Sequence, residues 1–484
     1  MLITLTAPAF ADTWCIENGD ITVKAGDTKG TNKVSQGDKK DVEDTNTIIT
    51  NQKTDKASSN TVTIEANGKN DKVEVTLKDV NIDTSSRNNA AVSVTGSGNT
   101  TIKLDGDNHL AGGNGIYSNS SGSLTISGDE NDSLTAQGGD SRNGIYSVSG
   151  DVTISGGTVT ATGGNSTGSY GSGGDGIHSG SLTISGGTVT ATGGDSTGSN
   201  GLGGRGICSD SGGITISGGS TVTANGGNGS SGRDGISSSS GVTVSDGTVT
   251  ATGGPSTGSY GSGGDGIRSD GGVTISGGTV KAAGGDSKNG SGGDGIRSGD
   301  IDLSGSLELT AKAGSPNGKA LSQRGNELDL NTIKDKLGPG AKVTTTDADG
   351  KVIDQVPIPR PVEPEEPVIP GESSSSSDGG SAAPSAPASP LPGLTVTDKS
   401  GAVISYTSTQ SGNTLTVCVG RLTASFRISL AALRQLRAEG IETITFQTIL
   451  CSTTLSVDEL LAMGGEDAEA VLTHRSTDSS LTVG

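Results

Sequence analysis

A charged or amide residue stands directly before each of seven Gly-Ile pairs in this chain. The column is Asn114, Asn143, Asp175, Arg205, Asp234, Asp265 and Asp294. If equivalent residues stack at the spacing of neighbouring strands, adjacent carboxylates repel each other by roughly 1–3 kcal/mol. Calcium would offset this repulsion, because it accepts several carboxylate and carbonyl oxygens at flexible geometry. The predicted calcium ligands are Asp175, Asp234, Asp265 and Asp294.

Turn chemistry offers a second explanation of the same column. Asp side chains at hydrated corners can bond to the backbone of their own turn without a metal. Arg205 interrupts the column and would itself neutralise Asp175 or Asp234. The sequence alone leaves calcium binding and turn chemistry as alternatives.

The residue after each isoleucine forms a second column, which is expected to face outward. Its members are Tyr117, Tyr146, His178, Cys208, Ser237, Arg268 and Arg297. Aromatic faces pack against pyranose rings, and arginine binds the carboxylates of uronic acids. We therefore expect a groove for a sugar chain, with Tyr170 and Tyr260 on protruding loops holding the same ligand. Exposed tyrosines are also ordinary strand-forming residues, which is the alternative. The predicted ligand-binding residues are Tyr117, Tyr146, His178, Arg268, Arg297, Tyr170 and Tyr260.

A repeat positions both columns. Each copy contains Gly-Ile-x-Ser, then a run like Thr-Ile-Ser-Gly-Gly, then Thr-Val-Thr-Ala-Thr-Gly-Gly, and the isoleucines recur every 29 to 32 residues. Apolar and polar residues alternate within each segment, which is the period of a β-strand, and glycine pairs separate the strands. Three short strands per copy predict an all-β fold, a right-handed parallel β-helix with about 30 residues per coil. Ser118 and its equivalents are expected to form an inward ladder of hydroxyls that bond to one another.

The rest of the chain divides by composition. A Pro/Ser-rich linker, expected to be disordered, is followed by a small α+β domain without a chemical motif, in which Cys418 and Cys451 are candidates for a disulfide. Helices are expected at Ser429–Glu439 and after the capping box that begins at Ser456. The predicted segments are 1–11, the remnant of a signal peptide; 12–60, an irregular N-terminal cap; 61–356, the β-helix with its end cap; 357–393, the linker; and 394–484, the α+β domain.

Composition excludes several classes of function. Aromatic residues make up 2% of the chain, which is too few for one large globular core, whereas a coil of stacked strands needs only thin apolar columns. The formal net charge of −20 opposes binding to nucleic acid, and no segment beyond the leader is apolar enough to enter a membrane. The small-x-small site at Ala9–Ala11 predicts secretion.

The repeat also resembles a known family. Gly-Ile-Tyr-Ser, Ser-Leu-Thr-Ile-Ser-Gly-Gly-Thr-Val-Thr-Ala and the entry segment at 101–106 are similar to secreted, carbohydrate-binding parallel β-helix proteins of clostridial bacteria. A characterised relative in that group binds cellulose and acidic pectic sugars and carries calcium, so the resemblance implies similar ligands here. Members of the group often have Asp-Gly-Ile where this chain has Asp175, Asp234, Asp265 and Asp294. Asn114, Asn143, Arg205 and the long Gly-Ser loops depart from the family pattern.

The resemblance and the columns together predict a non-catalytic protein that binds polysaccharide at the bacterial surface. A structural or adhesive stalk without glycan specificity is the alternative. A polysaccharide lyase is less favoured, because its calcium cluster and basic residue would have to come from Asp265, Asp294, Arg268 and Arg297 on a shallow face.

Overall fold

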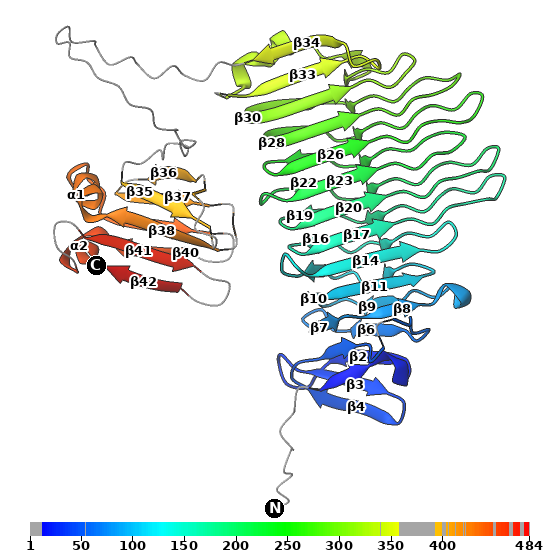
Figure 1. Ribbon diagram of the computed structural model, residues 1–484, viewed down its shortest axis with the longest axis horizontal. Coiled ribbons are helices and arrows are strands. Elements are labelled where there is room, and N and C mark those ends of the chain that lie inside the picture. Colours follow the sequence, from blue (N-terminus) through cyan, green and yellow to red (C-terminus); the bar gives the residue numbers. More distant parts are fainter. Residues whose placement is uncertain are drawn as a thin grey trace, which may run out of the picture. The chain divides into compact units, whose positions relative to one another are not determined.

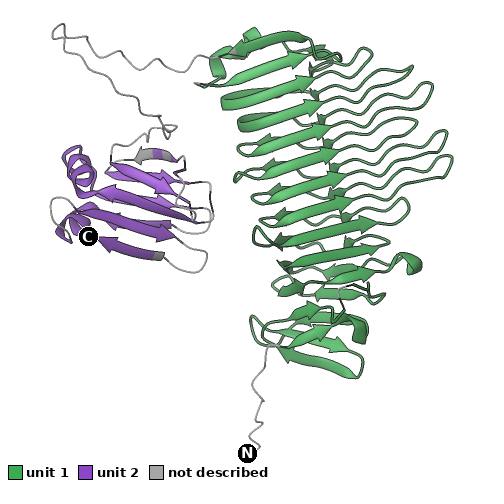
Figure 2. Ribbon diagram, in the orientation of Figure 1, with its two compact units in different colours: residues 1–363 green, residues 364–484 purple. Residues whose placement is uncertain are grey.

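The computed structural model (Figure 1) describes residues 12–357 except 54 and 339, and residues 393–483 except 399–402, 405, 412, 420, 422, 449–451, 464–467 and 475–478. The chain divides into two compact units, Met1–Glu363 and Pro364–Gly484 (Figure 2). The leader predicted at 1–11, nearly all of the linker predicted at 357–393, and Cys451 lie outside the described residues.

The first unit is a parallel β-solenoid of about 12 coils with about 29 residues per coil, as the repeat predicts. Each regular coil contributes one strand to each of three faces, and every strand pairs in parallel with its equivalent in the next coil. Face 1 carries the Gly-Ile-x-Ser segments. Its strands are β6 (Val62–Ala66), β9 (Val92–Gly96), β12 (Ile116–Ser118), β15 (Ile145–Ser147), β18 (Ile177–Ser179), β21 (Ile207–Ser209), β24 (Ile236–Ser238), β27 (Ile267–Ser269), β29 (Ile296–Ser298) and β31 (Leu321–Gln323).

Faces 2 and 3 carry the other two segments of each coil. Face 2 consists of β7 (Lys72–Lys78), β10 (Asn99–Asp105), β13 (Leu124–Ser127), β16 (Val152–Ile154), β19 (Leu182–Ile184), β22 (Ile214–Ile216) and β25 (Val242–Val244). Face 3 consists of β8 (Asn81–Asp83), β11 (Asp107–Gly112), β14 (Ser133–Gly138), β17 (Thr158–Thr162), β20 (Thr188–Thr192), β23 (Thr221–Asn225) and β26 (Thr248–Thr252). The long strands β28 (Val273–Ala283) and β30 (Ile301–Lys312) each run through both faces.

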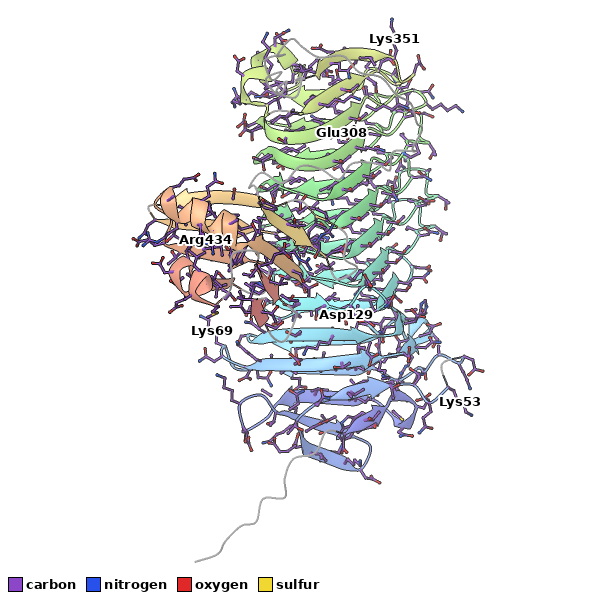
Figure 3. The ribbon with its side chains drawn as sticks, turned by 60° about the vertical axis from the view of Figure 1, so that its left-hand side comes forward. Lys53, Lys69, Asp129, Glu308, Lys351 and Arg434 are labelled. Atoms are coloured by element: carbon purple, nitrogen blue, oxygen red, sulfur yellow. The ribbon has the colours of Figure 1, made fainter. Side chains whose placement is uncertain are left out.

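The core consists of stacked columns of identical or similar side chains. Ile116 pairs with Ile145, and Ile145 with Ile177, and all three side chains are fully buried. Because side chains alternate along a strand, the neighbouring threonines and charged residues lie outside. Figure 3 shows the side chains of Lys53 and Lys351 directed away from the coils. This alternation lets a sequence poor in apolar residues bury a continuous core.

The inward serine column is structural, but its hydrogen bonds differ from the expectation. Ser147 Oγ donates to the backbone carbonyl of Gly150 at 2.9 Å, and the single proton of Ser209 Oγ is shared between the carbonyls of Gly180 and Gly212, each 2.8 Å away. The bonded hydroxyls therefore hold backbone groups of the turns after the face 1 strands, in their own or the preceding coil, and do not bond to one another. Ser179 Oγ is buried without a partner.

Residues 12–60, expected to be an irregular cap, contain five strands. β2 (Ile21–Ala25) pairs in parallel with β6 and so already belongs to face 1, while β1 (Thr13–Cys15) and β5 (Ile48–Thr50) stack below β7. β3 (Asn32–Gln36) and β4 (Lys39–Asp44) continue the face 1 sheet in antiparallel order. Buried Trp14 donates its indole N–H to buried Asp44 at 2.7 Å.

The far end of the solenoid is closed by antiparallel strands and short helices. β32 (Asn326–Glu327) pairs with β31, and β34 (Val352–Pro357) pairs with β33 (Lys342–Thr346), which itself lies on β30. Leu330 in η3 (Leu330–Thr332) is fully buried, and Ile333, directly before η4 (Lys334–Lys336), is nearly so. These two side chains cover the last coil of the core.

From residue 163 onward the connections between face 3 and face 1 lengthen into a loop stack, defined as residues 163–175, 193–205, 226–234, 253–265 and 284–294. In Figure 1 these loops project from one edge of the solenoid in parallel layers. Glycine N–H groups join the two legs of a loop and then the next loop, with Gly174 bonded to Gly164 and Gly194 to Gly174, both at 2.8 Å. A Cβ on Gly174 would overlap a backbone carbonyl of the preceding coil, so this packing requires glycine.

The second unit is the predicted small α+β domain. Ser429 accepts a hydrogen bond from the Ala432 N–H, and Ser456 from the Glu459 N–H, so both predicted helix starts are confirmed. No helix in the described part of the chain is long and apolar enough to span a membrane. The elements are β35 (Leu394–Thr397), β38 (Ala424–Ser429), β41 (Glu469–His474) and β42 (Ser479–Val483) in one sheet, β36 (Thr407–Ser411), β37 (Thr414–Cys418), β39 (Thr443–Gln447) and β40 (Ser452–Ser456) in another, and helices α1 (Leu430–Ala438) and α2 (Val457–Ala462).

Candidate functional site

The Asn and Asp residues before the Gly-Ile pairs form a hydrogen-bonded ladder at the corner between face 3 and face 1. A side-chain oxygen in one coil accepts the backbone N–H of the equivalent residue in the next coil. Acceptor, donor and N···O distance are Asn114 and Asn143 (2.9 Å), Asn143 and Asp175 (2.7 Å), Asp175 and Arg205 (2.6 Å), Asp234 and Asp265 (2.9 Å), Asp265 and Asp294 (2.7 Å), and Asp294 and Lys319 (2.7 Å).

This ladder gives each predicted calcium ligand a structural task. One carboxylate oxygen of each aspartate already accepts a backbone N–H, which accounts for Asp and Asn sharing the column. The bonds reach the neighbouring coil. The turn alternative assumed instead that they reach the residue's own turn. Arg205 has no acceptor oxygen and interrupts the ladder. Calcium binding stays a prediction.

Asp265 is the most strongly perturbed carboxylate of the ladder. Its residue is 5% exposed, and burial, together with the charges of Asp234 and Asp294, raises its pKa to about 7. The hydrogen bond from the Asp294 N–H and the charge of Arg297 oppose that rise without cancelling it. The ladder therefore holds a carboxyl group whose charge changes near neutral pH.

The outward column of face 1 is in register over all seven coils, as predicted, and begins with an aromatic cluster. The ring centroids of Tyr117 and Tyr146 lie 5.7 Å apart with a 50° tilt. His178 meets Tyr146 edge-on at 5.0 Å. These three rings form one continuous half-buried surface across β12, β15 and β18.

His178 is held between two carboxylates from different coils. Its Nδ1 lies 2.8 Å from Asp175 Oδ2, and its Nε2 lies 2.7 Å from Asp210 Oδ2. Burial lowers the pKa of His178, but the two carboxylates outweigh burial and raise it above the usual value. The imidazole therefore connects the outward column to the aspartate ladder.

Cys208 keeps its place in the outward column, between His178 and Ser237, but it is covered by its neighbours. The residue is 2% exposed, and its thiol lies 3.4 Å from Asp210 Oδ1. Burial raises the pKa of the thiol to about 12. The column is thus divided into an aromatic part before Cys208 and a basic part after it.

The basic part lies too far away to share one sugar unit with the tyrosines. Arg268 follows Tyr146 by four coils, which at about 4.8 Å per step is roughly 19 Å. Arg268 pairs with Asp270 at 3.7 Å, and Arg297 lies one coil further along. Only a ligand that spans several coils can reach both parts.

Tyr170 and Tyr260 lie on the loop stack and not on face 1. They are 81% and 95% exposed, and neither ring packs against another aromatic ring in the described part of the chain. Each stands in the middle of a loop that leaves the coil between face 3 and face 1. The structure does not bring them together with Tyr117 and Tyr146.

A groove opens beside the tyrosine pair, here called the tyrosine groove. Its volume is about 510 Å³, and Asn88, Asn89, Tyr117, Arg142 and Tyr146 contribute to its lining. A larger recess of about 820 Å³ shares Asn88 and Arg142 with it and extends over the end of face 3. The Arg142 side chain is exposed and has no carboxylate partner among the residues the structure describes.

Sequence reasoning missed Asn88, Asn89 and Arg142 because it followed columns of equivalent positions. Asn88 ends the short helix η2 (Ser85–Arg87) with a positive φ of 54°, in an irregular early coil. Arg142 lies in the connection at 139–143, which is shorter than the loops that follow. That change of loop length is the signal in the sequence that indicates where the recess lies.

Comparison with known proteins supports the fold. The β-helix repeat family matches residues 182–204, 214–240, 242–267 and 273–296. A search of curated proteins and of solved structures gave no match. The matched segments lie in the later regular coils of the solenoid and leave the tyrosine groove outside them.

Proposed function

We propose that the chain is a secreted, non-catalytic polysaccharide-binding protein whose primary site is the tyrosine groove. The observation that carries this proposal is the packed pair of Tyr117 and Tyr146 at the edge of an open groove lined with amide groups and one unpaired guanidinium. Secretion rests on the apolar leader and the small-x-small site at Ala9–Ala11.

The chemistry of the groove suits a sugar chain. Tyrosine rings offer apolar faces to pyranose C–H groups, and their hydroxyls remain free to bond at the rim. Asn88 and Asn89 supply both donors and acceptors, as sugar hydroxyls require. Arg142 can donate two parallel hydrogen bonds to vicinal hydroxyls or to a uronic acid carboxylate. The ligand class is therefore a neutral glucan or an acidic pectic chain.

Catalysis is disfavoured by the state of the groups that a lyase would use. Asp265 and Asp294 already accept backbone N–H groups in the ladder, and Arg268 is paired with Asp270. These residues lie several coils away from the tyrosine groove. An open groove with aromatic walls holds a chain without enclosing one bond of it.

The test compares two double variants of the full chain. Tyr117→Ala with Tyr146→Ala removes the packed pair, while Tyr170→Ala with Tyr260→Ala removes the exposed loop tyrosines as a matched control. Affinity electrophoresis in polygalacturonate or soluble cellulose derivatives, and sedimentation with insoluble cellulose, measure binding. We expect the first pair to lose at least about tenfold in affinity and the control to be unchanged.

Two outcomes would contradict the proposal. If the first double variant binds as tightly as the wild type, the ligand lies elsewhere on the solenoid. If the wild type is not retained by any of these polysaccharides, a structural stalk becomes the better account. Circular dichroism of each variant establishes that it is folded.

A further inference from the structure

Three side chains with different metal-binding chemistry converge where face 1 meets the aspartate ladder. One ligand atom each from Asp175, His178 and Cys208 lies within 4.8 Å of the other two. His178 on β18 and Cys208 on β21 are direct partners in the parallel pairing. Asp175 lies three residues before His178, at the corner that leads into β18. The coil geometry therefore fixes all three in adjacent positions.

The groups around this cluster already orient it. Asp175 Oδ1 is anchored by the Arg205 N–H at 2.6 Å, which leaves Oδ2 directed at His178 Nδ1, 2.8 Å away. His178 Nε2 lies 2.7 Å from Asp210 Oδ2. A metal-binding histidine commonly donates its second ring N–H to a carboxylate, which fixes the tautomer and leaves the other nitrogen free to coordinate.

We propose that Asp175, His178 and Cys208 bind one divalent transition-metal ion of the Zn²⁺ type. The ligand atoms would be Asp175 Oδ2, His178 Nδ1 and the Cys208 thiolate, with Asp210 as the carboxylate behind the histidine. Ligand atoms in a tetrahedral zinc site lie roughly 3.4–3.8 Å apart, given metal–ligand distances of about 2.0–2.3 Å. The cluster reaches this spacing by small movements of its side chains.

The donor set selects this class of ion over calcium. Calcium takes six to eight oxygen ligands, whereas thiolate and imidazole are the donors that zinc and its neighbours prefer. This site is distinct from the predicted calcium row, which uses carboxylates alone, and it shares only Asp175 with it. Three protein ligands leave a fourth position for water in tetrahedral coordination.

Two guanidinium groups nearby, those of Arg205 and Arg233, oppose a cation. The partly buried side chain of Arg205 interacts electrostatically with Cys208, Asp175, Asp234 and Asp210. Once the thiol has lost its proton to solvent, these four anionic groups outnumber the two guanidinium charges, so the local balance still favours a divalent ion. Replacing Arg205 by Asn, the residue type found at position 143 of the same ladder, should therefore tighten metal binding.

The experiment uses the full chain, depleted of metal by a chelator, and titrates it with ZnCl₂ in a calorimeter and with CoCl₂ in a spectrophotometer. We expect one equivalent of Zn²⁺ and a near-ultraviolet charge-transfer band from a cobalt–thiolate bond. Cys208→Ser should abolish the band and lower the affinity for zinc at least tenfold. Asp210→Asn should weaken binding by about 10–100-fold while keeping the band.

Matched controls separate this site from other ligands in the chain. Triple replacement of Cys15, Cys418 and Cys451 by Ser leaves Cys208 as the sole thiol and should retain both the band and the affinity. Asp175→Asn keeps the acceptor for the Arg205 N–H and removes a metal ligand, so weaker binding in a folded protein implicates the carboxylate. Asp265→Asn removes a carboxylate from the calcium row and should leave zinc binding unchanged.

The proposal is overturned if Cys208→Ser binds Zn²⁺ as tightly as the wild type, or if the wild-type cobalt complex shows no thiolate band. Should Cys208→Ser fail to fold, the spectrum of the triple cysteine variant decides in the same way. Because Tyr117, Tyr146 and polysaccharide take no part in these readouts, failure here leaves the proposed function untouched.

Discussion

Asp265→Asn offers the sharpest test of the electrostatics of the ladder. The replacement keeps a side-chain oxygen that can accept the Asp294 N–H at the observed 2.7 Å, and it removes the negative charge. Asp265 is almost fully buried between two other aspartates of the column, so its charged form is disfavoured in the folded protein. The variant should therefore be more stable than the wild type at every pH at which this carboxyl group is ionised in the unfolded chain.

The size and the direction of the effect follow from the pKa. Folding raises the pKa of Asp265 from an ordinary 3.8 to about 7, which corresponds to a free energy of about 4 kcal/mol. Because the folded pKa is the higher one, the stabilising contribution is fully present below pH 3.8 and is lost as pH rises through 7. We expect Asp265→Asn to match the wild type near pH 4 and to exceed its stability by up to about 4 kcal/mol at pH 8.

Urea unfolding followed by circular dichroism at several values between pH 4 and pH 8 measures the difference between variant and wild type. Hydrogen exchange of the peptides around Asp265 and Asp294 localises it to these coils, since repeat arrays can unfold in parts. Asp195→Asn is the control, because Asp195 also accepts a backbone N–H from the next coil, at 2.8 Å, but is more exposed. A difference that does not grow with pH would refute the reasoning.

Three further changes test the packing of the coils by the same unfolding measurements. Gly174→Ala forces a Cβ into a backbone carbonyl of the preceding coil and should cost at least about 3 kcal/mol, whereas Gly241→Ala, whose Cβ would lie 3.6 Å from its nearest neighbour, should cost under about 1 kcal/mol. Ser209→Ala removes the hydroxyl shared between two backbone carbonyls and should cost about 1–2 kcal/mol, while Ser179→Ala, which loses no hydrogen bond, should be neutral or stabilising. Asp44→Ala leaves the buried N–H of the chain's single tryptophan unpaired and should lower stability by about 2 kcal/mol, read by tryptophan fluorescence at the N-terminal end, with Asp44→Asn costing less.

The sequence predicts the solenoid well because its information is periodic. An apolar residue at every second position assigns the inside and the outside of each strand, and a spacing of 29 to 32 residues sets the length of a coil. Residues with the same role in every copy, such as Ile177, were therefore placed correctly. The irregular first coils carry no repeat, and the strands within residues 12–60 were accordingly missed.

The repeat period does not predict contacts that depend on which residues are neighbours. Cys208 has an outward position, but its small side chain is covered by the residues around it, among them Asp210 and Arg205. The serine hydroxyls were expected to bond to one another, yet the turn directly after each strand presents closer carbonyl oxygens. In both cases the local surroundings, set by the bend of the coil, determine what the side chain contacts.

Loop length, and not the repeat itself, creates the larger recess beside the tyrosine groove. The loop stack requires glycine, because its two legs approach closely enough for Gly204 to bond to Gly194 at 2.7 Å and Gly194 to Gly174 at 2.8 Å. Backbone hydrogen bonds therefore hold the loops of the stack in fixed positions. The loop stack ends at the shorter connection 139–143. The larger recess opens there, between residues 138–142 and 162–165. The end of the loop stack therefore opens the recess beside the tyrosine groove. Lengthening the 139–143 connection to match 163–175 should fill this recess and, if the proposed function holds, weaken polysaccharide binding while leaving the coils folded.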